Sequence, residues 1–222
     1  MKILVVAANG ALGRELSTKL MAGGAQVLGT ARTNESAATL PAGLSQALLL
    51  DLESDESMDT LTSYILSSGL ELDAIAVASG LVAFGSIADT PMATTQKLLR
   101  VNHEGPLRLI TALLPRLAQS QKNPFVLSIS GVVAEKVFPG MAAYVASKTA
   151  HSTWLKALAL EARRDGIRVL DARPGHTETG LANRAVSGVA PNFPPGMTAE
   201  HVVDVILRAI EDGTKDLPSE AF

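Results

Sequence analysis

Apolar residues along this chain follow two alternating periods. Short, continuous apolar runs, such as KILVVA at 2–7, indicate strands that are buried on both faces. Longer stretches with an apolar residue every three or four positions, such as Leu12, Leu16 and Leu20, indicate amphipathic helices. This pattern predicts strands at 2–7, 26–31, 46–50, 73–78, 125–130 and 167–172. It predicts helices at 11–22, 54–67, 92–118, 142–164 and 198–212.

The alternation predicts an α/β fold. Strands that are apolar throughout favour a parallel sheet, because right-handed helical crossovers then cover both of its faces. We therefore expect one domain over residues 1–222, a doubly wound parallel sheet with helices on both faces. Thr90 and Pro91 suit the N-cap and first turn of the helix at 92–118, and Pro106 and Pro115 should bend that helix.

Composition narrows the classes of function. The chain has 19 basic and 22 acidic side chains and 4% aromatic residues, so it lacks a basic footprint for nucleic acid. Cysteine is absent, which excludes disulfides, thiolate metal sites and cysteine nucleophiles, and the four histidines show no metal-site spacing. No apolar run approaches the ~20 residues of a membrane helix, and MKILVVAANG is too short for a secretory signal. We expect a soluble, cytoplasmic protein with no nucleic-acid or membrane partner.

The first turn carries a candidate phosphate site. The spacing Ala7-x-x-Gly10-x-x-Gly13 joins the first strand to the first helix. Backbone amides at a helix N-terminus attract pyrophosphate when small residues allow the phosphate to approach. We expect a dinucleotide to contact Asn9, Gly10, Ala11, Leu12 and Gly13. The same pattern also fits an ordinary Asn-Gly turn before a helix.

The next two strand ends carry candidate contacts for the adenosine half of that dinucleotide. Arg32 stands where an acidic residue would accept hydrogen bonds from a ribose 2′-hydroxyl. An arginine there can instead pair with a 2′-phosphate, which favours NADP over NAD, although exposed arginines are common at strand ends. Asp51, followed by Leu52, could accept a hydrogen bond from the adenine amino group, or could be an acid near the start of the helix at 54–67.

The segment AYVASK carries candidate acid/base chemistry. Tyr144 and Lys148 are four residues apart on a predicted helix and therefore share one face. An ammonium beside a phenol favours the phenolate and lowers the phenol pKa, so such a tyrosine can exchange a proton with a carbonyl or alcohol oxygen. A Tyr-x-x-x-Lys pair alone also occurs on ordinary helix surfaces.

Several motifs together resemble the short-chain dehydrogenase/reductase family over nearly the whole chain. They are the glycine turn, Val101-Asn102, YVASK at 144–148 and RPGHTET at 173–179. The resemblance implies a Rossmann-like fold and an NAD(P)-dependent oxidoreductase of the carbonyl reductase or alcohol dehydrogenase type. It implies hydride transfer between a nicotinamide and a small carbonyl or hydroxyl substrate. It also implies a homodimer or homotetramer built on the helices at 92–118 and 142–164.

The resemblance assigns roles to individual residues. Tyr144 would be the acid/base, and Lys148 would hold the nicotinamide ribose and lower the tyrosine pKa. Asn102 would bend its helix and hold a proton-relay water. Further cofactor contacts would come from the ends of two strands, at Ala78, Ser79, Gly80, Pro174, Gly175, Thr177 and Thr179.

The chain departs from the family pattern in its active site. The family serine lies thirteen residues before the tyrosine, a position held here by Gly131. Ser130 is one residue early, and a one-residue step along a strand turns a side chain to the other face unless the strand end bulges. We take Ser130 as the candidate catalytic hydroxyl. The departure leaves open an NADP-binding protein with little catalysis, such as a redox sensor or scaffold subunit, or an isomerase or dehydratase on the same fold.

Irregular segments are expected to set specificity. They are the loops at 81–90 and 132–141 and a candidate substrate lid at 180–197, which contains GVAPNFPPG at 188–196. Glu135 and Lys136 lie at the substrate mouth or are simply exposed, and His176 is either a solvated loop residue or faces the substrate. His151 and His201 have the pattern of ordinary helix residues. Pro218 and nearby charges leave little room for the seventh strand that family members commonly have.

Overall fold

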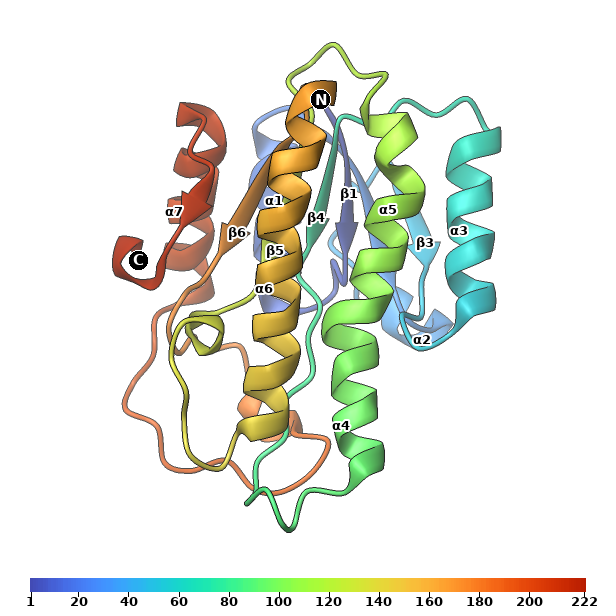
Figure 1. Cartoon of the computed structure of the whole chain (residues 1–222). Helices are drawn as coiled ribbons and strands as arrows, with labels where there is room; N and C mark the ends of the chain where they lie inside the picture. The colour runs from blue at the N-terminus through green and yellow to red at the C-terminus, as the bar shows by residue number, and fades with distance from the viewer.

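Seven parallel strands form one sheet in the order β3-β2-β1-β4-β5-β6-β7 in the computed structural model, which describes residues 1–222 (Figure 1). The strands are β1 Lys2–Val6, β2 Gln26–Ala31, β3 Gln46–Leu49, β4 Ala74–Val77, β5 Phe125–Ile129, β6 Arg168–Ala172 and β7 Asp216–Leu217. The six predicted strands are confirmed to within one residue at each end. The expectation about the seventh strand needs correction, because two residues before Pro218 pair with β6 in parallel.

Helices cover both faces of this sheet, which confirms the doubly wound architecture. They are α1 Ala11–Ala22, α2 Asn34–Ala37, α3 Asp55–Ser67, α4 Met92–Leu99, α5 Gly105–Leu117, α6 Ala142–Ala162 and α7 Ala199–Asp212. Short 3-10 turns occupy Val132–Ala134, Arg163–Asp165, Ala182–Arg184 and Ser219–Ala221. Side chains of α3, α5 and α6 form one buried apolar cluster against the sheet, and those of α1 and α7 form a second on the opposite face. None of the helices combines the length and the hydropathy needed to cross a bilayer.

The helix expected at 92–118 is two helices joined by a π-helical turn. The turn spans Arg100–Glu104 and has Asn102 at its centre. Pro106 lies in the first turn of α5, where a missing N–H costs little, so the break precedes the proline rather than following from it. Pro115 lies inside α5, which continues to Leu117.

The start of α4 also differs from the expected one by a residue. Pro91 is the N-cap, and the first helical residue is Met92. The Thr90 hydroxyl, expected to cap the helix, instead donates a hydrogen bond to the Ser86 carbonyl oxygen at 2.8 Å. The loop before α4 is therefore held by a hydrogen bond between two of its own residues, Ser86 and Thr90.

The strand order reverses between β1 and β4, and this switch point positions the site. In an open parallel sheet, ligands bind outside the carboxyl ends of the strands at such a reversal. The three segments expected to set specificity, at 81–90, 132–141 and 180–197, all lie at that same edge, at the bottom of Figure 1. The fold thus gathers the expected cofactor contacts and the expected substrate loops on one side of the molecule.

Candidate active site

A cavity of about 740 Å³ opens at the carboxyl edge of the sheet. Of the residues that the sequence marked as catalytic or cofactor-binding, only Gly13 and Asn102 do not line it. The lining set is Asn9, Gly10, Ala11, Leu12, Arg32, Asp51, Leu52, Ala78, Ser79, Gly80, Ser130, Tyr144, Lys148, Pro174, Gly175, Thr177 and Thr179. Residues from the ends of six strands therefore meet in one cavity.

The glycine turn has the shape that a pyrophosphate requires. Gly10 caps α1 without a side-chain hydrogen bond, so the first backbone N–H groups of the helix have no side-chain acceptor. A Cβ atom at Gly13 would lie 2.2 Å from the Ala7 carbonyl oxygen, so Gly13 allows α1 to pack on the turn rather than lining the cavity. Ala7, which occupies a usual glycine position, adopts a φ of 59°. The turn therefore requires a left-handed backbone conformation at Ala7, which is unfavourable for a residue with a Cβ atom.

Charged side chains surround the expected adenosine end of the cavity. The Arg32 side chain is 62% exposed, and its guanidinium lies 3.9 Å from the Glu53 carboxylate. Glu53 also lies 3.2 Å from the Lys97 ammonium. The Asp51 carboxylate accepts a hydrogen bond from the Glu53 backbone N–H at 2.9 Å. Arg32 therefore has only one weak partner, and its guanidinium is available to an incoming anion.

Tyr144 and Lys148 lie one turn apart near the start of α6, in the cavity wall. The Lys148 ammonium donates a hydrogen bond to the Ile129 carbonyl oxygen at 2.8 Å. Burial lowers the pKa of Lys148 to about 8, against a smaller opposing effect of the Asp171 charge. Burial also raises the pKa of Tyr144 to about 12, so the expected lowering by lysine is not found in the protein alone. At pH 7 the phenol is protonated and the lysine is largely an ammonium ion.

Asn102 is a positioning residue behind the cavity wall. It is 1% exposed, and its amide exchanges two hydrogen bonds with the Leu81 backbone, at 2.8 and 2.9 Å. The same amide donates to the Ser147 hydroxyl, which donates in turn to the Tyr144 carbonyl oxygen. The π-helical turn thus locks the segment after β4 to the helix that carries the tyrosine. A side chain with these partners has little capacity left to hold a water.

The backbone conformation after β5 favours glycine at position 131, where the family serine would lie. Gly131 adopts φ 79° and ψ 164°, a region that is essentially restricted to glycine. Ser130 is among the cavity residues, but it is 1% exposed, and its buried hydroxyl has no hydrogen-bond partner within the protein. The Ser79 hydroxyl, on the neighbouring strand end, is also buried and unpartnered. Because both oxygens are buried, a ligand would meet either hydroxyl only after its side chain turned toward the cavity.

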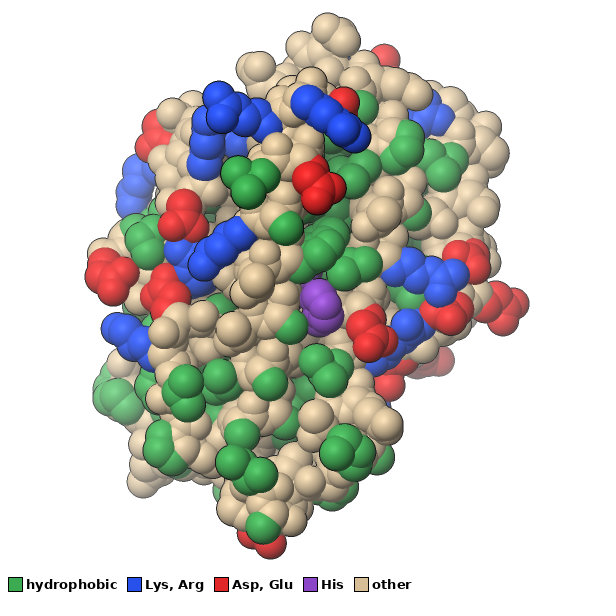
Figure 2. Space-filling model, in the orientation of Figure 1, with side chains coloured by type: hydrophobic (Ala, Val, Ile, Leu, Met, Phe, Trp, Pro, Cys, Tyr) green, Lys and Arg blue, Asp and Glu red, His purple; other side chains and the backbone are tan.

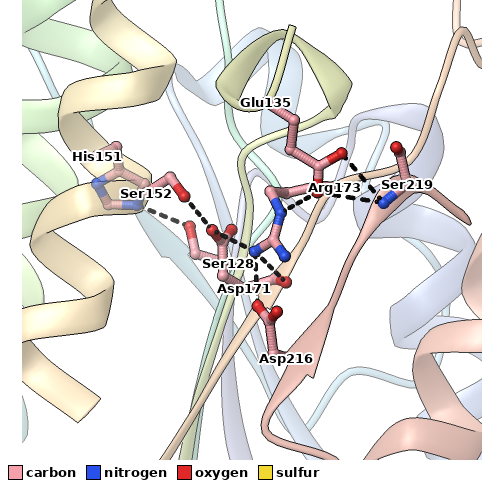
Figure 3. Close-up of polar contacts among 8 residues, drawn as sticks. All are labelled: Ser128, Glu135, His151, Ser152, Asp171, Arg173, Asp216 and Ser219. Atoms are coloured by element: carbon pink, nitrogen blue, oxygen red, sulfur yellow. Dashed lines mark hydrogen bonds and ion pairs between the residues drawn. The ribbon is translucent and has the colours of Figure 1, made fainter. Parts of the chain in front are cut away.

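A buried ion-pair network fixes the segment that precedes Pro174-Gly175 (Figure 3). Arg173 is 4% exposed and pairs with Asp171 at 3.0 Å, Glu135 at 2.5 Å and Asp216 at 2.7 Å. Burial lowers the pKa of Arg173, but its bonds to Asp216 and Glu135 and the Asp171 charge outweigh burial and raise it. The Glu135 carboxylate also accepts from the Ser219 backbone N–H. Glu135 is thus a structural partner rather than a residue of the substrate mouth.

His151 is more buried than an ordinary helix residue, and His176 lies at the cavity, one of its two expected positions. His151 is 1% exposed, bonds the Ser128 hydroxyl at 2.8 Å and stacks on Trp154, with ring centroids 5.8 Å apart. Burial and the Lys148 charge lower its pKa to about 3, so His151 is neutral at pH 7. His176 lines the cavity and stacks on Phe193 at 4.7 Å.

Other cavity residues carry no signal in the sequence. Phe84, Phe138 and Met141 come from the expected specificity loops, but no spacing or motif marks them individually. Only the chain topology brings these loops to one edge. Sequence reasoning therefore identified the segments but not the side chains.

Comparison with known proteins agrees with this geometry. A family model for the short chain dehydrogenase matches residues 1–189. The chain belongs to the short-chain dehydrogenase family. Family members with similar sequences include an uncharacterized oxidoreductase, YmfI, of Bacillus subtilis, which is 31% identical over 98% of this chain and 90% of its own. Dehydrogenase/reductase SDR family member 7B of Xenopus tropicalis is 27% identical over 97% of this chain and 75% of its own.

Solved structures of short-chain dehydrogenases have the same fold. One from Streptomyces avermitilis is 25% identical, with a TM-score of 0.85 over 99% of this chain and 89% of that one. Another, from Sphingobium yanoikuyae in complex with NADPH, has a TM-score of 0.87 at 22% identity and covers 98% of this chain and 86% of that one. The chain is therefore an NAD(P)-dependent oxidoreductase of the short-chain dehydrogenase family with a glycine at position 131.

Proposed function

We propose that this chain is an NADP-dependent carbonyl reductase or alcohol dehydrogenase acting on a small carbonyl or hydroxyl compound. The observation that carries the proposal is the position of Tyr144 and Lys148, one helical turn apart in the wall of the cavity into which the glycine turn opens. NADPH or NADP is bound in structural neighbours from Sphingobium yanoikuyae and Burkholderia cenocepacia. Their fold supports a nicotinamide cofactor for this chain.

The cavity wall supplies the contacts that such a cofactor needs. The unpaired amides of α1, with Asn9 and Gly10, would hold the pyrophosphate, and Arg32 would pair with the 2′-phosphate of NADP. Asp51 and Leu52 would contact the adenine. The nicotinamide half would lie against Ala78, Ser79, Gly80, Pro174, Gly175, Thr177 and Thr179. Arg32 is the reason for proposing NADP rather than NAD.

The reaction requires a proton as well as a hydride. A bound nicotinamide supplies or accepts the hydride at the carbonyl carbon. The Tyr144 phenol, protonated at neutral pH, would donate its proton to the carbonyl oxygen during reduction. The Lys148 ammonium would stabilise the resulting phenolate and hydrogen-bond the ribose hydroxyls. The unpartnered Ser130 hydroxyl would donate a hydrogen bond to the same oxygen.

Replacement of Tyr144 tests the proposal directly. Tyr144→Phe removes the proton donor and keeps the ring, so we expect turnover of a carbonyl substrate to fall by about 10²- to 10⁴-fold. The dissociation constant for NADPH, measured by fluorescence titration, should stay within about twofold because the cofactor contacts remain. Tyr64→Phe, at an exposed position on α3, is the matched control. Full activity of Tyr144→Phe would exclude the proposed role.

The conformation of Gly131 favours a second candidate, an NADP-binding protein with little catalysis. Gly131 adopts φ 79°, a conformation that favours glycine, so the position where family members carry the serine supplies no hydroxyl here. NADPH oxidation measured with a panel of ketones and aldehydes distinguishes the two candidates. Tight NADPH binding without turnover of any member would favour a sensor or scaffold.

A further inference from the structure

Beyond Tyr144, the cavity is walled by apolar side chains. Val82, Phe84, Val133, Met141 and Val145 form a small buried cluster of their own, separate from the two clusters that hold the sheet. These residues come from the segments after β4 and β5 and from the start of α6. A third apolar cluster at the ligand-binding edge does not support the sheet, so it shapes the space next to the tyrosine.

The segment 188–196 contributes Phe193 and Pro194 to the cavity wall. At its start, the Ser187 carbonyl oxygen accepts from the Phe84 N–H at 2.9 Å, and a Cβ atom at Gly188 would lie 1.8 Å from the Phe84 carbonyl oxygen. At its end, the Gly196 N–H donates to the Glu178 carboxylate at 2.8 Å. The Met197 N–H donates to the His176 carbonyl oxygen at 2.9 Å. Both ends of the segment are thus hydrogen-bonded beside the cavity, and the lid expected at 180–197 stays a prediction.

One side chain of this segment, Phe193, contacts aromatic rings from two other segments of the cavity wall. Its ring stacks on His176 with centroids 4.7 Å apart and an interplanar angle of 26°. The same ring lies 6.0 Å from the Phe84 ring, tilted by 51°. Such spacings suit aromatic contacts, and a third ring can join them by edge or offset stacking.

The three loops also carry exposed apolar side chains. Ile87, Val137 and Val189 are 81%, 82% and 89% exposed, and each comes from a different one of the three loops. Figure 2 shows hydrophobic side chains spread over the lower part of this face, below the region where most charged side chains gather. The end of the molecule that carries the loops is therefore more apolar than the rest of this face.

Few charged side chains line this end of the cavity. Arg184 donates a hydrogen bond to the Thr179 carbonyl oxygen at 3.3 Å and has no carboxylate partner, and His176 lies 3.4 Å from the Glu178 carboxylate. Lys148 belongs to the proposed catalytic pair. The acidic lining residues, Asp51 and Glu53, lie at the adenosine end. The substrate end therefore has one free cation, Arg184, among apolar side chains, rather than the convergent set that binds a carboxylate or phosphate strongly.

We propose, building on the function proposed above, that the substrate is an uncharged ketone or its alcohol with an apolar, ring-bearing substituent. The substituent packs against Phe193 and Phe84, which line the cavity. Phe193 is then a specificity-determining residue. A charged keto acid of equal size would lose its hydration in a wall where Arg184 is the one free cation.

Steady-state kinetics of the full-length protein with NADPH test this proposal. Along a series of straight-chain methyl ketones from acetone upward, kcat/KM should rise by about fourfold for each added methylene group. The isosteric pair 5-methyl-2-hexanone and 4-oxopentanoate isolates the charge, and the ketone should exceed the keto acid by at least about tenfold. For 4-phenyl-2-butanone, Phe193→Ala should lower kcat/KM by about tenfold or more, whereas acetone changes by less than about twofold.

Two further variants separate packing from folding. Phe193→Leu keeps apolar volume and should retain kcat/KM for the straight-chain ketones within about threefold of wild type. Leu66→Ala is the matched control, because Leu66 on α3 is 40% exposed and Phe193 is 37% exposed. Unchanged values for both Phe193 variants, or an equal loss for acetone and 4-phenyl-2-butanone, would overturn the role of Phe193. A flat ketone series, or preference for 4-oxopentanoate, would overturn the substrate class.

Failure of this inference differs from failure of the proposed function. If acetone and 4-oxopentanoate are reduced and Tyr144→Phe abolishes that turnover, the reductase assignment stands and only the substrate class is wrong. If no ketone is reduced and no secondary alcohol is oxidised, both are overturned.

Discussion

The Lys148 ammonium donates a hydrogen bond to the carbonyl oxygen of Ile129, the last residue of β5, at 2.8 Å. This bond fixes the lysine against the sheet and aligns the first turns of α6, from which Tyr144 enters the cavity. One backbone oxygen does not compensate for the loss of water around a charge, and burial accordingly lowers the pKa of Lys148 to about 8. The proposed catalytic arrangement of Lys148 and Tyr144 is therefore maintained at a cost in stability.

Replacing Lys148 should raise the free energy of unfolding and lower the turnover. In the unfolded chain the lysine has a pKa near 10.5, so at pH 7 folding buries an ammonium ion. Lys148→Met removes that penalty but leaves the Ile129 carbonyl unpaired, and we expect the free energy of unfolding at pH 7 to rise by about 2 kcal/mol. Turnover should fall by about 10²-fold or more. Urea unfolding and NADPH oxidation measure the two effects.

The pH dependence identifies the cause of this gain. The folded wild type loses the lysine proton near pH 8 and the unfolded chain near pH 10.5, so the penalty in the wild type disappears between these values. The excess stability of Lys148→Met should therefore be largest at pH 7 and shrink as pH rises from 8 to 10.5. A difference that is constant with pH would show that packing, not charge, accounts for it. Lys156→Met, at an exposed position later on α6, serves as the control.

Ser130 and Gly131 give a second prediction about the same strand end. Ser130→Ala removes the unpartnered hydroxyl of the cavity wall and should lower kcat by about 10²-fold, without change in the midpoint of unfolding. Ser17→Ala, at an equally buried serine on α1, is the control. An unchanged kcat would mean that Tyr144 alone polarises the carbonyl.

Gly131 is tested with a pair of variants that differ by one hydroxyl. Gly131→Ala and Gly131→Ser should each destabilise the fold by about 1–3 kcal/mol, because φ 79° with ψ 164° strains any side chain. A Cβ atom there meets its first neighbour, the Pro174 carbonyl oxygen, only at 3.7 Å, so crowding adds little. Equal stability losses in urea unfolding would confirm backbone strain as the cause. A loss confined to Gly131→Ser would contradict it.

Periodicity was sufficient to predict the sheet, because strands buried on both faces are continuously apolar. It was insufficient at the helix over 92–118, because the π-helical turn depends on hydrogen bonds between Asn102 and the distant Leu81 backbone. The seventh strand was underestimated for a similar reason. Its two residues are stabilised by pairing with β6 and by the ion pair between Asp216 and Arg173, not by their own propensity.

Sequence motifs predict the cofactor side of the site but not the substrate side. Tyr144, Lys148 and the glycine turn belong to motifs that follow strands, and the parallel sheet places these strand ends at one cavity. Phe84 and Phe193 are 109 positions apart in the sequence, and their contact depends on loop closures at Gly188 and Gly196. Such closures combine backbone bonds and close packing that no local pattern encodes.

Arg32 should decide between the two nicotinamide cofactors. Arg32→Ala removes the cation available to a 2′-phosphate, so the KM for NADPH should rise by about tenfold or more and that for NADH by less than about twofold. Glu53→Gln releases Arg32 from its only carboxylate partner and should lower the KM for NADPH by a few fold. Arg164→Ala, 84% exposed and outside the cavity, is the control. Equal changes for NADPH and NADH would exclude recognition of the 2′-phosphate by Arg32.

The buried network around Arg173 gives the largest predicted effect on stability. Arg173→Met leaves the buried Asp171 carboxylate and the partly exposed Glu135 carboxylate without their cation, and the unpaired buried charge makes the loss about 3–5 kcal/mol. Asp216→Asn should cost at most about 1 kcal/mol, because that side chain is 62% exposed.

A double variant separates charge from packing in this network. Adding Asp171→Asn to Arg173→Met removes one stranded carboxylate and should recover part of the loss, so the two free energies should not add. Urea unfolding of the four proteins of this cycle at pH 7 measures the coupling. Strict additivity would show that Arg173 stabilises the fold through its aliphatic packing, and that the charges drawn together at the end of β6 contribute little.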